Sequence, residues 1–215
     1  MINLGFHGIG APERELEPDE DQFWIDAPRF EQLLDTALEL PEVRLTFDDG
    51  NASDISVALP MLLERGLTAA FFVVAGRLGQ PGSLAADDVR ALAEAGMTIG
   101  THGMRHRPWR FLDEDGYREE LDEAREILEA AAGTRIDEAA CPYGAYDRRT
   151  LRALEPRKFR RVYTVDRRAA APDDWLQPRY VMRRDDTART VRGFGSESVP
   201  RTFALAAKTA VKRWR

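Results

Sequence analysis

Short apolar runs alternate along this chain with longer segments in which apolar residues recur every three or four positions. The short runs predict buried strands, and the longer period predicts amphipathic helices. We expect strands at residues 2–6, 43–47, 68–74, 98–100, 138–141, 162–165 and 179–182. We expect helices at residues 28–40, 53–64, 86–95, 114–132 and 147–154.

Strands that alternate with helices predict βα units and a parallel sheet. Seven such strands in 215 residues indicate a single α/β domain over residues 1–215, built as a distorted parallel (β/α) barrel of about seven strands. An open parallel sheet remains the alternative, because periodicity alone does not separate the two. In barrels of this kind the chemistry gathers at the C-terminal ends of the strands. Residues 10–21, rich in Glu, Asp and Pro, are interpreted as a solvated loop over that rim.

Composition narrows the class of protein only slightly. Hydrophobic residues make up 43% and charged residues 32%, as in ordinary globular proteins, and the net charge of −6 argues against a general nucleic-acid binder. Cys141 is the only cysteine, so no intramolecular disulfide is expected. The sequence shows neither a secretory signal nor eighteen consecutive apolar residues, which predicts a cytoplasmic location. Residues 202–215 form a basic amphipathic helix candidate; we expect it to pack on the barrel, with membrane-surface contact as the alternative.

Two adjacent carboxylates, Asp48 and Asp49, follow the second predicted strand and precede Gly50. Carboxylates this close repel each other, so both stay ionised only if a cation or a hydrogen-bond donor compensates them. A metal ion bound by one carboxylate and a water held by the other would meet that need. Taken alone, Asp-Asp-Gly is also a common turn sequence.

His102 and His106 are four residues apart, a spacing that would stack both side chains on one face of a helix. Two imidazoles and one carboxylate form a three-ligand site that leaves coordination open for water and substrate, as in catalytic zinc sites. An ordinary surface pair is the alternative. The chain has only three histidines, however, and two fall within five residues. Together with the carboxylate pair, this concentration predicts a mononuclear metal site and metal-assisted hydrolysis.

The segments Thr46–Gly50, His102-x-x-x-His106 and Pro142-Tyr143-Gly144 resemble, in order and spacing over residues 43–182, successive motifs of the polysaccharide deacetylase (NodB-homology, carbohydrate esterase family 4) domain. The resemblance implies a distorted (β/α) barrel of that type. It also implies one divalent metal ion, usually Zn, with Co, Mn or Ni as alternatives. By this likeness Asp49, His102 and His106 are the metal ligands and Asp48 is the general base.

Two departures from the usual family pattern concern catalysis. The family has an arginine shortly before the Pro-Tyr/Phe-Gly element, where this chain has Ala140, and a late catalytic histidine, whereas no histidine follows His106. Residues 4–10 resemble the N-terminal strand of the circularly permuted, poly-N-acetylglucosamine deacetylase branch, in which that histidine is moved to the first strand. Pro178-Arg179 matches a late Pro-Arg element of the same branch. The resemblance therefore implies that His7 is the catalytic acid; a histidine that only caps a strand is the alternative.

Three further residues complete the expected site. Arg179 is expected to hold Asp48 ionised through a charge-assisted hydrogen bond, unless it is one of many surface arginines. Tyr143, together with Pro142, lies in a turn whose backbone N–H could face the developing oxyanion. Trp175 is expected to pack over Asp48 or to wall the acetyl pocket, with burial in the core as the alternative.

The predicted activity is hydrolysis of an N-acetyl amide on an amino sugar or polysaccharide. In this hypothesis the metal polarises the acetyl carbonyl and activates a water, Asp48 takes the proton of that water, and His7 protonates the leaving amine. An O-acetyl esterase or a deformylase acting on a sugar conjugate would use the same apparatus. A non-catalytic carbohydrate-binding relic is the alternative outside enzymes, although pure binding does not need the spare carboxylate.

Overall fold

The computed structural model describes residues 1–40 and 42–194, and its centre is one curved, all-parallel sheet. The strand order is β7-β6-β5-β4-β3-β2-β1-β8. Neighbours in sequence are therefore neighbours in the sheet from β1 to β7, as expected for repeated βα units. The strands are β1 (Ile2–Phe6), β2 (Val43–Asp49), β3 (Ala69–Val73), β4 (Thr98–Thr101), β5 (Glu138–Ala140), β6 (Arg161–Thr164), β7 (Leu176–Pro178) and β8 (Tyr180–Val181).

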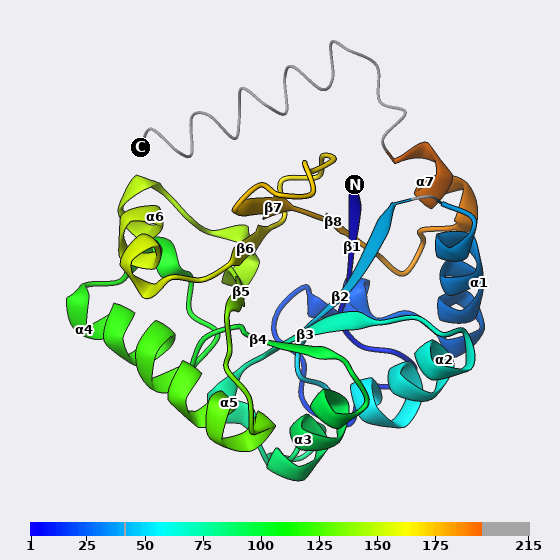
Figure 1. Cartoon of the computed structure of the whole chain (residues 1–215). Coiled ribbons are helices and arrows are strands. Elements are labelled where there is room, and N and C mark those ends of the chain that lie inside the picture. Colours follow the sequence, from blue (N-terminus) through cyan, green and yellow to red (C-terminus); the bar gives the residue numbers. More distant parts are fainter. Residues whose placement is uncertain (41, 195–215) are drawn as a thin grey trace.

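Helices surround the outer face of this sheet (Figure 1). Two of the five predicted helices contain a π-helical stretch: η2 (Asp54–Ala58) leads into α2, and η5 (Arg118–Glu123) joins α4 to α5. The α-helices are α1 (Ala27–Leu38), α2 (Leu59–Glu64), α3 (Ala86–Glu94), α4 (Glu114–Tyr117), α5 (Ala124–Ala132), α6 (Arg148–Leu154) and α7 (Ala188–Gly193).

The predicted fold class is confirmed: the structure is a nearly closed parallel barrel with eight strands. Strand β7 was not expected, because its residues are Leu176, Gln177 and Pro178, and proline removes a backbone donor. Strand β7 pairs with β6, and β8, two residues later, pairs with β1. One short run of chain thus reaches from one edge of the sheet to the other and nearly closes the barrel. Arg179 lies at the junction between the two strands.

The two faces of β2 show how the strands divide core from site. Leu45 and Phe47 belong to the main apolar core, where Phe47 meets Phe30 of α1 edge-on. Because successive side chains of a strand point to opposite faces, Thr46 and Asp48 point into the barrel, where both contact Arg179. The apolar positions therefore hold the helices, and the alternate positions supply polar groups to the barrel interior.

The described part of the chain contains no helix that is both long and apolar enough to span a bilayer. The basic amphipathic helix expected at residues 202–215 lies outside the described residues.

Candidate metal centre and active site

A cavity of about 380 Å³ opens at the C-terminal ends of the strands, where the sequence places most of its candidate residues. His7 directly follows β1, Asp48 and Asp49 end β2, and His102 directly follows β4. The parallel register pairs Phe6 with Phe47, so His7 and Asp48 come next on adjacent strands. Both residues line the cavity, together with Asp49, His102 and His106.

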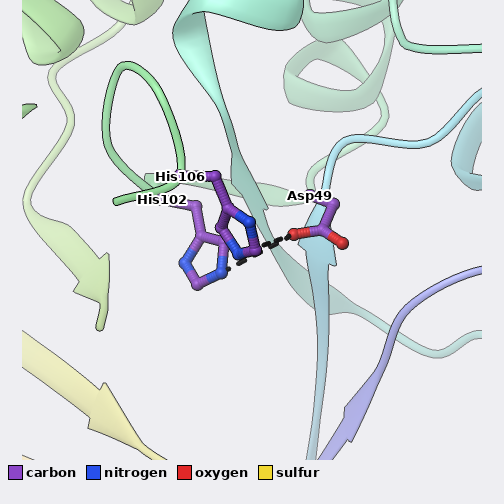
Figure 2. A group of neighbouring side chains, drawn as sticks. All are labelled: Asp49, His102 and His106. Carbon is purple, nitrogen blue, oxygen red and sulfur yellow. Dashed lines mark ion pairs between the residues drawn. The ribbon is translucent and has the colours of Figure 1, made fainter. Parts of the chain in front are cut away.

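Asp49, His102 and His106 converge on one point (Figure 2). The Nε2 atom of His102 is 3.7 Å from Asp49 Oδ1, and the Nε2 atom of His106 is 3.4 Å from the same oxygen. All three side chains are buried, and their ligand atoms lie within 4.8 Å of one another. The three predicted ligands are therefore brought together from two different strand ends.

This group fits a divalent metal ion. Asp49 Oδ1 is buried and has no hydrogen-bond partner within the described residues, although an ionised oxygen in that position requires compensation. Two imidazole nitrogens and one carboxylate oxygen form a donor set that zinc and neighbouring divalent ions accept, with positions left for water and substrate.

The backbone around the ligands departs from regular structure. Asp49 has φ +80° and Gly50 has φ +73°, so the chain turns at the second carboxylate and both carboxylates can face the cavity. The i, i+4 spacing suggested that the two histidines share one face of a helix, but they do not. They lie in a loop after β4 in which Gly103 has φ +87° and His106 has φ +55°. Positive φ at a non-glycine residue is costly and persists where surrounding contacts impose it.

Glu120 supplies much of that constraint on the histidine loop. This fully buried carboxylate on η5 accepts the backbone N–H of Met104 at 2.9 Å and that of Arg105 at 3.1 Å. It also accepts from Arg107 Nε at 2.9 Å. A side chain sixteen residues further along the chain thus shapes the loop that carries two of the predicted metal ligands.

Each histidine ligand has a partner on its other ring nitrogen. His102 Nδ1 is 2.8 Å from the carbonyl oxygen of Ala140, and burial lowers the pKa of His102 to about 4, so the ring is neutral. His106 Nδ1 is 3.0 Å from both carboxylate oxygens of Glu17. Burial opposes ionisation of His106, but the hydrogen bond with Glu17 and the charge of Asp49 raise its pKa above the ordinary value. In both rings Nδ1 faces its hydrogen-bond partner, and Nε2 faces Asp49, where the metal ion would bind.

Asp48 forms a bidentate ion pair with Arg179, and both side chains are buried (Oδ1–Nη1 2.6 Å, Oδ2–Nη2 2.7 Å). Nη1 of Arg179 also donates to Thr46 Oγ1 at 3.1 Å. Burial opposes ionisation of Asp48, but the guanidinium holds its pKa well below the ordinary value. The guanidinium therefore favours the ionised form of the carboxylate and fixes its orientation. Asp48 Oδ2 is 4.0 Å from His102 Nε2, beside the metal position.

His7 reaches the same cavity from β1. Its ring stacks on Phe23 with the ring centres 5.0 Å apart and the planes 23° from parallel. Its Nδ1 atom is buried without a hydrogen-bond partner among the described residues. The imidazole is thus held by an aromatic contact, and its Nδ1 atom is uncommitted within the described residues.

Comparison with known proteins agrees with this geometry. Residues 37–162 match the family model described as polysaccharide deacetylase. The chain belongs to the polysaccharide deacetylase family. It is 30% identical over 137 residues to a peptidoglycan-N-acetylglucosamine deacetylase of Bacillus cereus, a match that covers 61% of this chain and 48% of that protein. The chain spans about half the length of the curated relatives it matches.

Solved structures share the fold of this polysaccharide deacetylase family member, and two of them are compared below. The deacetylase PplD of Streptococcus pyogenes superposes with a TM-score of 0.76 at 19% identity, covering 89% of this chain and 96% of that one. IcaB from Ammonifex degensii superposes with a TM-score of 0.72 at 21% identity, covering 91% and 97%. These likenesses show a common barrel; the permuted branch suggested by His7 stays a prediction.

The remaining predicted residues divide between the cavity and the core. Tyr143 lines the cavity in a left-handed conformation (φ +57°), with its ring centre 4.4 Å from that of His106. Pro142 is buried and begins the short 3₁₀ turn η6 (Pro142–Gly144) that carries Tyr143. Trp175 does not line this cavity: its indole N–H donates to the Phe159 carbonyl oxygen at 2.9 Å, and its ring packs with the satellite core. This packing corresponds to the core alternative for Trp175.

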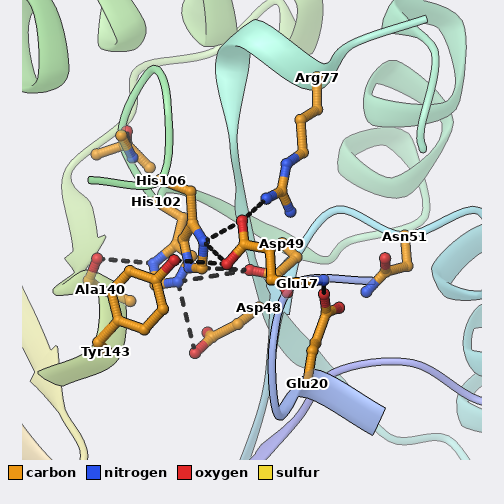
Figure 3. A network of polar contacts seen from close by, with 12 residues as sticks. Glu17, Glu20, Asp48, Asp49, Asn51, Arg77, His102, His106, Ala140 and Tyr143 are labelled. Carbon is orange, nitrogen blue, oxygen red and sulfur yellow. Dashed lines mark hydrogen bonds and ion pairs between the residues drawn. The ribbon is translucent and has the colours of Figure 1, made fainter. Parts of the chain in front are cut away.

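Sequence reasoning missed Glu17. Residues 10–21 were interpreted as a solvated loop, but Glu17 lines the cavity and contacts His106, Tyr143 and Arg77 (Figure 3). These contacts, the His106 hydrogen bond first, outweigh partial burial and lower the pKa of Glu17 to about 2. No local motif marks the residue, because its partners lie on other elements of this deacetylase fold.

Proposed function

We propose that this chain is a metal-dependent hydrolase that removes N-acetyl groups from an amino sugar or polysaccharide. One arrangement supports this function above all. The ionised carboxylate of Asp48, locked by Arg179, lies beside the buried Asp49–His102–His106 group and shares a cavity with His7. A site that only bound metal or carbohydrate would have no use for the extra carboxylate next to the ligands. Membership of the polysaccharide deacetylase family supports the same reaction class.

Asp49, His102 and His106 would hold the metal ion, zinc being the first candidate and Co, Mn or Ni the alternatives. When bound, such an ion supplies Lewis-acid chemistry to the acetyl carbonyl and to the attacking water. The partners of the ligands, the Ala140 carbonyl and the Glu17 carboxylate, keep both imidazoles in the tautomer that this requires.

The chain's own residues then handle the protons. Asp48 accepts a proton from the attacking water on a lone pair that Arg179 does not use, and the bidentate contact with Arg179 keeps the carboxylate ionised and fixed. The backbone N–H of Tyr143, in its left-handed turn, donates to the oxygen on which negative charge develops. His7 follows β1, next to the strand that carries Asp48. It donates a proton to the leaving amine, which is too basic to depart unprotonated.

The base assignment is tested with Asp48→Asn. The substrate is an N-acetylglucosamine oligomer, and acetate release and bound zinc are measured on the same sample. We expect turnover to fall by roughly 10²- to 10⁴-fold while zinc content stays near one per chain, because the ligands are untouched. Asp173→Asn is the control: Asp173 is exposed and does not line the cavity. An Asp48→Asn protein that keeps its activity would rule out this carboxylate as the base.

The acid assignment is tested with His7→Ala on matched N-acetyl and O-acetyl sugars. An amine needs protonation to leave, whereas an alcohol leaves more easily, so amide cleavage should fall much more than ester cleavage. Equal losses on both substrates would contradict a role for His7 as acid. A wild-type protein that cleaves esters far better than amides would favour the esterase alternative, and one that binds zinc but cleaves neither would favour the binding relic.

A further inference from the structure

The segment of residues 10–23, which joins β1 to α1, is a closed loop across one side of the cavity. Its base is tied by the N–H of Gly10, which donates to the Ile25 carbonyl at 2.8 Å, and by the N–H of Ile25, which donates to the Gly8 carbonyl at 3.0 Å. Inside the loop, the buried carboxylate of Glu20 accepts from Arg14 and from the backbone N–H of Glu17. The loop is thus braced from within and presents Glu17 to the cavity.

The carboxylate of Glu17 makes three contacts outside its own loop (Figure 3). Both oxygens are 3.0 Å from Nδ1 of His106, one accepts the Tyr143 hydroxyl, and one pairs with the Arg77 guanidinium. These partners come from the histidine loop, the η6 turn and the segment after β3. Glu17 therefore links the N-terminal segment to three elements that surround the metal position.

The two ligand imidazoles are fixed by unlike groups. His102 donates to a backbone carbonyl of the adjacent strand β5, which the sheet itself holds in place. His106 sits at φ +55° in an irregular loop, and its ring depends on a charged carboxylate 89 residues away in the sequence. A carboxylate on Nδ1 holds the proton there, leaves the Nε2 lone pair for a metal, and makes that nitrogen a stronger ligand.

We propose that Glu17 is the positioning residue for the metal ligand His106, so that the metal affinity of this site depends on the closed conformation of residues 10–23. The proposal rests on the metal site of the proposed function but not on its substrate. Glu17 lies on the side of His106 away from Asp49, so it acts through the imidazole and is not itself a ligand.

The test is zinc affinity, measured by competition with a chromogenic chelator, in wild type, Glu17→Gln and Glu15→Gln. Glutamine keeps the size of the side chain and removes the charge that polarises His106. We expect Glu17→Gln to raise the Kd for zinc by about 10- to 100-fold, as loss of such partners typically does. Glu15, exposed in the same loop and outside the cavity lining, provides the matched control and should leave the Kd unchanged. Equal zinc affinity in Glu17→Gln and wild type overturns the proposal.

A second measurement does not depend on the variant folding. Nitrogen-15 NMR of histidine-labelled, zinc-bound wild type should show His106 protonated at Nδ1 and coordinated through Nε2. Coordination through Nδ1 overturns the proposal. A wild type that fails to bind zinc overturns both this proposal and the metal site of the proposed function. A wild type that binds zinc through Nε2, loses affinity in Glu17→Gln and yet releases no acetate supports the role of Glu17 and removes only the deacetylase assignment.

Discussion

Two neighbouring aspartates at the end of β2 acquire different chemistry from their surroundings. Asp48 faces the barrel interior and meets the Arg179 guanidinium, whereas Asp49, at φ +80°, turns toward the two imidazoles. The first carboxylate is paired with a protein cation, which keeps it ionised. The second keeps a buried oxygen without a hydrogen-bond partner in the described part, which suits it to a metal. The two identical side chains thus meet different partners, because successive strand residues point to opposite faces and Asp49 has a left-handed backbone conformation.

Replacing Arg179 by methionine should damage both stability and catalysis. The change leaves Asp48 buried without its cation, which typically costs about 3–5 kcal/mol of unfolding free energy. The sign of the pH effect follows from the pair: without the guanidinium the pKa of Asp48 rises, so the acid limb of the kcat/KM profile moves to higher pH. Denaturant unfolding and pH–rate profiles measure the two effects. An unchanged acid limb in a folded Arg179→Met protein would show that Asp48 is not held ionised in this way.

Asp54 is a buried carboxylate that takes no part in the proposed reaction, and its pKa can be tested through stability. It is fully buried in η2 with neither carboxylate oxygen hydrogen-bonded in the described part, and burial, followed by the charge of Asp49, raises its pKa well above the ordinary value. The folded state therefore keeps a proton that the unfolded state loses, and stability falls as the pH rises above the ordinary carboxyl pKa. In chelator-treated protein, Asp54→Asn should raise the unfolding free energy at pH 7 more than at pH 4. A benefit independent of pH would contradict the raised pKa.

The site depends on two loops whose conformations are held by carboxylate side chains. The loop between β4 and α4 carries both histidine ligands, and Glu120 of η5 holds it through backbone N–H groups. The loop between β1 and α1 is held through Glu17 and Glu20. Barrel strands set where each loop starts, and these buried or half-buried carboxylates decide its conformation.

Glu120→Ala should loosen the histidine loop. Two backbone donors lose a charged acceptor, so the unfolding free energy should fall by about 2–3 kcal/mol, and zinc affinity should fall because His102 and His106 lose their relative placement. Glu119→Ala is the matched control from the same helical stretch. In the described part of the chain Glu119 pairs with the side chains of Arg105 and Arg107 near the surface. Its loss should lower the unfolding free energy by less than about 1 kcal/mol. Equal effects of the two variants would sink this account of the loop.

The candidate site and the barrel closure share the same residues. The polypeptide passes from β7, paired with β6, to β8, paired with β1, and Arg179 at that junction reaches Asp48 on β2. Asn3 of β1 ties the same junction, because its amide donates to Gln177 and to the Pro178 carbonyl, both at 3.0 Å. Closing the barrel therefore completes the site.

Removing the metal should accordingly destabilise the entire fold. Zinc at 100 times its Kd adds about 2.7 kcal/mol to the folded state, which corresponds to roughly 5–10 °C in Tm for a chain of this size. We expect a chelator to lower Tm by that amount and added zinc to restore it, as followed by calorimetry. His102→Ala should show no zinc-dependent change, since it lacks one ligand. A zinc-dependent shift that survives in His102→Ala would place the stabilising ion elsewhere.

Local sequence patterns are sufficient to locate most of the strands and the short motifs. Short apolar runs located seven of the eight strands within a few residues, because a strand buried inside a parallel sheet is a local run of apolar residues. Asp48, Asp49, His102 and His106 could be chosen from two short segments, because ligands that follow strands in sequence meet at one edge of a parallel sheet.

The long-range partners of the site residues depend on how the chain folds. Glu17 meets His106 across 89 residues without a local signal that distinguishes it from other glutamates, whereas Arg179, 131 residues from Asp48, was expected only through its likeness to a Pro-Arg element. Strand β7 and the core position of Trp175 likewise depend on how the barrel closes. Local periodicity reports which face of a segment is buried, whereas the contacts that orient a catalytic group are set by strand order and loop packing, which bring distant segments together.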